Sequence, residues 1–241
     1  MSAVQLLPFI TTAIIFAFAF LVLRRYSQRG GMHNLMWGIG LVMYGLGTFA
    51  EAFLAAAYVP FVLYAWYLFG ALLTPAWLGQ GTVYLLVRRR NVANVLLAIL
   101  TLLSIFAALK VFSLPITGDY NVGVPVSAQY REVLQRDVLT TTLLAIFAVY
   151  GTLALVGGAL YSAYIFLRKR VMPQRVLGNV FIAIGGLSPA IGGALAARGL
   201  GDVLFASELL GAVLLFIGFR LATTQQPVAA PPAPTPAATS A

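Results

Sequence analysis

The sequence predicts an all-α, polytopic membrane protein with seven transmembrane helices, an N-terminus outside and a C-terminus in the cytoplasm. The first observation is composition: 61% of the 241 residues are hydrophobic and 9% are charged, whereas a soluble domain carries about 25% charged residues. The second is seven apolar segments that reach the roughly 20 residues needed to cross a bilayer. The third is that basic residues follow alternate segments, which sets the orientation.

The seven predicted spans cover most of the chain and leave room for short connections. The first span has no basic residue before it and is followed by Arg24 and Arg25, which indicates a retained helix rather than a signal peptide. Residues 1–222 are therefore predicted to form one transmembrane domain. The spans are 3–23, 32–57, 61–87, 92–113, 138–167, 176–197 and 203–222.

The charges are divided between the two ends of these spans. Eleven of the 15 basic residues follow the first, third, fifth and seventh spans, whereas all six acids and the other four basic residues belong to the opposite ends. The positive-inside rule places the basic ends in the cytoplasm, which predicts a multi-pass protein of the plasma (cytoplasmic) membrane, the cell inner membrane. These basic residues are expected to contact anionic membrane lipids, and no nucleic acid is expected as a partner.

Two segments lie outside the membrane. The loop 113–137 is predicted to be external, and the helical spacing of apolar residues within 127–137 predicts that the fifth helix begins early and projects outside. In that helix Glu132 and Arg136 would form an i,i+4 pair. The tail 223–241 is rich in proline and alanine and is predicted to be disordered in the cytoplasm.

Two carboxylates inside the apolar segments are the leading candidates for a site. Glu51 is predicted to lie about 10 Å from the outer end of the second helix, and Glu208 about 9 Å from the outer end of the seventh. An ionisable residue within the membrane indicates function unless a partner compensates it. Lys110 and Arg198, at outer helix ends, are the candidate partners; such ion pairs would hold helices together instead of binding a ligand.

The sixth helix carries a predicted weak point at the same depth. Ser188 and Pro189 lie between the pairs Gly185-Gly186 and Gly192-Gly193. Proline removes a backbone hydrogen bond and kinks a helix, so this segment is predicted to form a deformable wall of a pocket. The alternative is close packing, because small residues let helices approach in lipid.

Other residues suggest little chemistry. Tyr58, Trp66 and Tyr67 near the outer edge are interpreted as an interfacial aromatic belt. His33 is the only histidine and there is no cysteine, so no haem or zinc site and no cofactor are predicted. The segment 199–202 resembles the GxGD motif of intramembrane aspartyl proteases, but the second membrane aspartate of that family is missing. We therefore do not predict an enzyme.

The functional hypothesis is an outward-facing acidic cavity that recognises a small polar or cationic ligand or an ion, in a sensor or a carrier. A sensor would need a partner membrane protein, because the chain has no output domain. The alternative is a non-catalytic structural or accessory subunit of a larger membrane complex. The two hypotheses differ in whether the carboxylates face an internal cavity or the surface. The predicted ligand-binding residues are Glu51, Glu208, Lys110, Arg198, Ser188 and Pro189.

Overall fold

The computed structural model describes residues 6–170, 172–196 and 198–223, and it confirms the all-α fold with seven helices long and apolar enough to span a membrane. Two of the spans are composite, because each contains a short π-helical segment, η2 or η3. The elements are α1 (Leu7–Arg29), α2 (Met32–Leu54), α3 (Pro60–Ala65), η2 (Trp66–Leu73), α4 (Thr74–Leu86), α5 (Arg90–Phe112), α6 (Val126–Val133), α7 (Val138–Thr152), η3 (Leu153–Gly157), α8 (Gly158–Arg168), α9 (Pro173–Ala196) and α10 (Asp202–Thr223).

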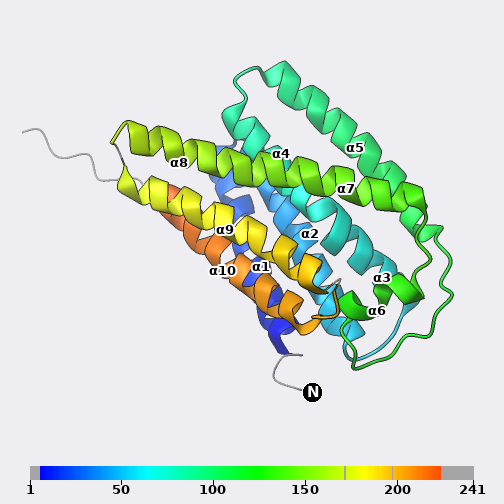
Figure 1. Ribbon diagram of the computed structural model, residues 1–241. Helices are drawn as coiled ribbons and strands as arrows, with labels where there is room; N and C mark the ends of the chain where they lie inside the picture. Colours follow the sequence, from blue (N-terminus) through cyan, green and yellow to red (C-terminus); the bar gives the residue numbers. More distant parts are fainter. Residues whose placement is uncertain (1–5, 171, 197, 224–241) are drawn as a thin grey trace, which may run out of the picture.

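The helices form a ring with one helix outside it (Figure 1). Around the ring α1 packs on α2, α2 on α4, α4 on α7 and η3, α8 on α9, α9 on α10, and α10 on α1. Helix α5 packs outside this ring against α4 and η2, and it is the least buried span. The ring brings the second and seventh spans, which are far apart in sequence, to opposite sides of a shared interior.

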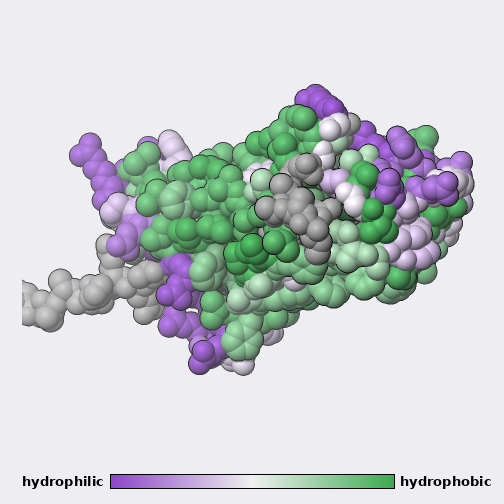
Figure 2. Space-filling view, turned by 90° about the horizontal axis from the view of Figure 1, so that it is seen from below, coloured by the Kyte–Doolittle hydropathy of each residue, from purple (hydrophilic) through white to green (hydrophobic). Residues whose placement is uncertain are grey.

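The surface has the pattern expected of a membrane protein. Figure 2 shows an apolar band across the middle of the molecule and hydrophilic residues gathered towards its two ends. Large apolar side chains stay exposed along α5, among them Leu102 and Leu109, at 68% and 70%. Such a face is stable in lipid, where the hydrocarbon chains replace protein as its apolar neighbour.

Glycines allow the helices to approach closely, which is the alternative considered for the glycines of the sixth span. A Cβ atom added to Gly47 of α2 would lie 2.6 Å from the Cα atom of Gly70 in η2. On α9, a Cβ atom at Gly185 would lie 2.8 Å from the backbone nitrogen of Leu215, and one at Gly178 would lie 2.7 Å from that of Ala222. Helices α9 and α10 are therefore in backbone contact along much of their length.

The loop between α5 and α7 contains a separate helix, α6, so the predicted continuous extension of the fifth helix is wrong. The chain leaves the helix because Leu134 forms an isolated antiparallel bridge with Ile116. A new helix then starts at Val138, where the side chain of Asp137 accepts a hydrogen bond from the backbone of Thr140. The predicted i,i+4 pairing of Arg136 is also wrong, because that residue is not helical.

Helix α6 lies across one end of the ring, next to the connection between α9 and α10 (Figure 1). The hydroxyl of Ser127 donates a hydrogen bond to the carbonyl oxygen of Gly201, at 3.4 Å. The side chain of Gln129 bonds the backbone of Asn121 and Val124, which fixes the preceding loop. The predicted disordered tail lies outside the described residues, apart from its first residue, Thr223, which ends α10.

Candidate functional site

A cavity of about 360 Å³ lies inside the ring, beneath α6. Its walls come from η2, α4, α7, η3, α9 and α10, and α6 closes one side. Most of the lining is apolar or glycine, with a few polar side chains at the end nearest α6. Those that matter for chemistry are Tyr44, Trp66, Tyr130, Arg131 and Glu208.

Two of the cavity walls contain π-helical segments, and a third contains a proline. The segment η2 ends at Leu73; the hydroxyl of the next residue, Thr74, donates to the carbonyl oxygen of Phe69 at 2.7 Å, and Pro75 follows without a backbone donor. The segment η3 forms part of another wall, and Pro189 lies within α9, which continues as an α-helix past it. π-Helical turns occur often at functional sites, and both η2 and η3 line the cavity.

The two candidate carboxylates lie near each other, and only one of them lines this cavity. Glu208 lines it, and Glu51, only 1% exposed, lies close enough to interact with Glu208 electrostatically. Both carboxylate oxygens of Glu51 and the Oε2 atom of Glu208 are buried and have no hydrogen-bond partner among the described residues. A buried polar group without a partner costs about 1–3 kcal/mol, and more when charged. The two carboxyl groups lie within hydrogen-bond reach of each other, so either a proton shared between them or a bound cation would satisfy the pair.

Glu51 lies closer to the end of its helix than the sequence predicted. Helix α2 ends at Leu54, three residues later, so Glu51 lies about 4.5 Å rather than 10 Å from the helix end. The loop between α5 and α6 covers it instead. Tyr120 from that loop donates a hydrogen bond to the Leu54 carbonyl oxygen at 3.2 Å and stacks on Tyr58. Burial, reinforced by the charge of Glu51, raises the pKa of Tyr120.

One hydrogen bond connects the two helices that carry the carboxylates. Tyr44, two turns before Glu51 on α2, donates its hydroxyl to the backbone carbonyl oxygen of Glu208 at 2.9 Å. The Tyr44 side chain is 5% exposed and also lines the cavity. The bond holds α10 in register with α2 and fixes the position of the Glu208 backbone, from which its side chain extends.

The predicted interfacial belt is wrong for two of its members. Trp66 and Tyr67 are 5% and 0% exposed and face the interior. The ring of Trp66 lies 5.2 Å from that of Tyr130 on α6, and its indole lies beside Glu51 without the geometry of a hydrogen bond. Aromatic faces and carboxylates therefore share one end of the cavity.

Two arginines belong to the same aromatic group. Arg136 lies over the Tyr130 ring, with its Cζ atom 5.0 Å from the ring centre. Arg131 lines the cavity and donates from Nε to the Tyr130 hydroxyl at 3.2 Å. Arg131 is exposed, so this cation lies at the rim of the cavity.

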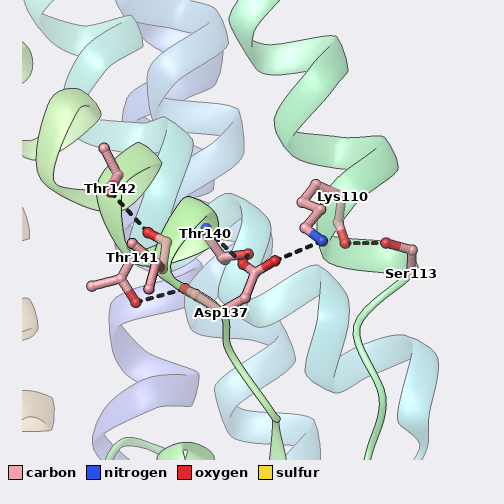
Figure 3. A network of polar contacts seen from close by, with 7 residues as sticks. Lys110, Ser113, Asp137, Thr140, Thr141 and Thr142 are labelled. Atoms are coloured by element: carbon pink, nitrogen blue, oxygen red, sulfur yellow. Dashed lines mark hydrogen bonds and ion pairs between the residues drawn. The ribbon is translucent and has the colours of Figure 1, made fainter.

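Lys110 does not compensate either carboxylate. Its Nζ atom lies 2.7 Å from the Oδ2 atom of Asp137, which also accepts hydrogen bonds from Thr140 at Oδ1 (Figure 3). The pKa of Asp137 is held well below its usual range, chiefly by the hydrogen bond from Lys110 and next by those from Thr140. The contact joins the ends of α5 and α7 and is structural.

The Asp137→Asn variant is expected to unfold at a lower temperature at neutral pH, because the amide can still cap α7 but loses the ion pair. A carboxyl with a depressed folded pKa contributes stability above its unfolded pKa of about 3.9, and this contribution disappears as pH falls through the folded value. The difference between wild type and variant should therefore shrink below about pH 4. Thermal unfolding in detergent across pH measures it; a difference that does not change with pH would contradict this account.

The remaining predicted residues divide between wall and surface. Pro189 lines the cavity, whereas the hydroxyl of Ser188 donates to the backbone carbonyl oxygen of Ser207 at 2.7 Å and ties α9 to α10. Arg198 is exposed in the turn after α9. The structure thus brings together Glu51, Glu208 and Pro189, and places Lys110 and Arg198 elsewhere.

Sequence reasoning missed the aromatic and basic side chains of the site. Tyr44 and Trp66 carry no signal that separates an inward-facing from an interfacial aromatic residue. Tyr130 and Arg131 were assigned to an external helix without a contact to the membrane domain. Among the described residues, no group of three or more His, Asp or Glu side chains is placed to hold a metal ion.

Comparison with protein-family models, curated proteins and solved structures finds no match.

Proposed function

We propose that this chain recognises a small cationic ligand in the cavity beneath α6, with Glu51 and Glu208 supplying the negative charge. The observation that carries the proposal is the carboxylate pair, of which both oxygens of Glu51 and the Oε2 atom of Glu208 are buried and lack a partner among the described residues. Two like charges in one buried place repel each other, and a bound cation would relieve both the repulsion and the missing contacts.

The rest of the lining favours an organic cation over a bare ion. The cavity volume of about 360 Å³ falls within the range of about 300–1,000 Å³ found for small-molecule sites. The rings of Trp66, Tyr44 and Tyr130 border it, and a cation over an aromatic face gains further attraction. A substituted ammonium group with an apolar body matches both kinds of surface.

The alternative role, an accessory subunit that uses these carboxylates for docking, requires them on an outer surface. Glu51 is 1% exposed and Glu208 lines the internal cavity. This placement supports the binding proposal. Both a sensor and a carrier are compatible with it, since either begins with recognition of the ligand.

The cavity is proposed to open to the outside of the plasma membrane. The argument is the charge asymmetry: the eleven basic residues gather at the ends opposite α6, and such ends face the cytoplasm. The N-terminus is then outside and the C-terminus inside.

Cysteines introduced singly, as Thr117→Cys and Gln28→Cys, test this orientation without background labelling because the chain contains no cysteine. Both positions are exposed and lie at opposite ends of the ring. In intact cells a membrane-impermeant thiol reagent is expected to label position 117 and leave position 28 unlabelled until the cells are opened. The opposite pattern would place the cavity on the cytoplasmic side.

Titration with tetramethylammonium tests the proposed function. The purified full chain in detergent is expected to gain thermal stability as this cation is added, because a ligand that binds only the folded state raises its stability. The neutral compound tert-butanol, which has a similar shape, should give no such gain. Glu208→Gln should abolish the cation effect, whereas Glu132→Gln, an exposed carboxylate of α6, should retain it. Equal responses from both variants would reject the carboxylate site.

A further inference from the structure

A second cavity lies at the opposite end of the ring from α6. Its volume is about 350 Å³, and α1, α2, α4, α8, α9 and α10 all contribute to its walls. In contrast to the acidic cavity, its charged lining consists of Arg25 and Arg175, with His33 beside them. The polar side chains of Asn34, Ser162 and Asn179 complete its lining together with apolar residues.

The two arginines of this cavity are distinct from the other basic residues at the same end. Both are half-buried, and each guanidinium lies against an aromatic ring: Cζ of Arg25 is 5.8 Å from the centre of Phe219, and Cζ of Arg175 is 5.7 Å from that of Phe166. The remaining described basic residues of this end are exposed; they are Arg24, Arg29, Arg88, Arg89, Arg90, Arg168, Lys169, Arg170 and Arg220.

No acidic side chain is among the described residues that line this cavity. All six acidic residues belong to the other end of the spans or to the loop that carries α6. Arg25 instead interacts electrostatically with Arg29 and with His33. Among the described residues the positive charge of this cavity therefore has no carboxylate counterion, and an anion from outside would neutralise it.

The cavity continues into a more open basic hollow. A neighbouring cavity of about 420 Å³ shares Arg25, Phe219 and Thr223 with it and adds Arg24, Arg29 and Arg220. An anion can thus approach along exposed arginines and reach the half-buried pair. This arrangement spans three or more helices, so an anion bound there would also cross-link the ring.

We propose that this cavity is a binding site for a phosphate group, held between Arg25 and Arg175. Guanidinium groups bind phosphate oxygens through paired, charge-assisted hydrogen bonds, and basic cavities between transmembrane helices suit the head groups of anionic lipids. The phosphate group is common to two sources, an anionic phospholipid and a soluble phosphate. The site is independent of the acidic cavity and of its proposed ligand.

The test compares two double variants that each remove two positive charges from the same end of the protein. Arg25→Gln with Arg175→Gln removes the half-buried pair, and Arg88→Gln with Arg89→Gln removes an exposed pair. Full-length protein is taken from nanodiscs of phosphatidylcholine and phosphatidylglycerol, and the lipid retained is counted by native mass spectrometry. Separately, inorganic phosphate is titrated against chloride at equal ionic strength, with thermal unfolding as the readout.

The cavity variant is expected to bind phosphate or retain phosphatidylglycerol at least about tenfold less well, because each lost hydrogen bond to a charged group costs at least that factor. The exposed-pair variant should match the wild type. An effect in the lipid arm alone identifies a head-group site, and an effect with inorganic phosphate identifies a site for the soluble anion as well.

Two results would overturn the proposal: equal losses in the two variants, which indicate general surface attraction, or no phosphate-specific effect in either arm. Loss of the packing of Arg25 on Phe219 can impair folding of the glutamine variant. The variant Arg25→Lys with Arg175→Lys keeps both charges and removes the guanidinium forks. It should fold and bind phosphate more weakly than the wild type; unchanged binding would also reject the site.

Discussion

Glu51→Gln and Glu208→Gln are each expected to make the protein more stable while making cation binding weaker. Both oxygens of Glu51 and the Oε2 atom of Glu208 are buried without a partner among the described residues, so exchange of one carboxylate for an amide removes a charge and offers a donor to the other. We expect the free energy of unfolding to rise by about 1–2 kcal/mol for each variant. Binding of tetramethylammonium should weaken about a hundredfold, because one half of a buried charge contact is lost.

The double variant should not show the sum of the two single effects. Once one carboxylate is an amide, the repulsion between the pair is already gone, so the second exchange gains less stability. Thermal unfolding and titration calorimetry on the wild type, both single variants and the double variant measure this coupling. Glu132→Gln provides the control for charge at the same end of the protein. Independent, additive effects or collapse of either single variant would show that each carboxylate has a separate structural partner, and the accessory-subunit hypothesis would then lead.

Gly151→Ala is expected to destabilise the protein by about 1–3 kcal/mol, the cost typical of overpacking. Gly151 of α7 faces the backbone of α4, and a Cβ atom there would overlap the carbonyl group of Pro75. Backbone cannot rotate away as a side chain can, so α7 must move from α4. Both helices line the acidic cavity, so cation binding should fall along with stability.

Gly157→Ala is the matched control from the same span. A Cβ atom at Gly157 meets no other atom within 4 Å, and alanine is favoured over glycine in a helix by about 1 kcal/mol. This variant should therefore be as stable as the wild type or slightly more so. Unfolding curves in one detergent compare the two exchanges directly; a loss of stability of the same size in both would mean that the α4–α7 contact is not as close as described.

Hydropathy predicted the spans well, because the length of an apolar run reports directly on the thickness of the bilayer. The exceptions arose where local hydrogen bonds determine where a helix begins or ends. Helix α2 ends at Leu54, before the apolar run does, and the fifth span starts at Val138 because Asp137 caps it. Neither the bridge from Leu134 to Ile116 nor the π-helical turns has a signature in hydropathy.

The site was only half predictable for a similar reason. A carboxylate in an apolar segment stands out in any sequence, which identified Glu51 and Glu208. The sequence does not show how each helix is rotated about its axis. Trp66 was therefore assigned to the membrane interface, although it faces the cavity. Assigning Lys110 as a partner of these acids failed because Asp137, at the start of the next span, lies nearer.

An experimental structure of the full chain with tetramethylarsonium tests the acidic cavity most directly. This cation has the shape of tetramethylammonium, and the anomalous scattering of its arsenic atom locates it without interpretation of weak density. The account predicts one arsenic peak beneath α6, beside the Glu51 and Glu208 carboxylates and within about 6 Å of the centre of the Trp66 ring. A cavity without a peak under saturating cation, or a peak only at the outer surface, would contradict it.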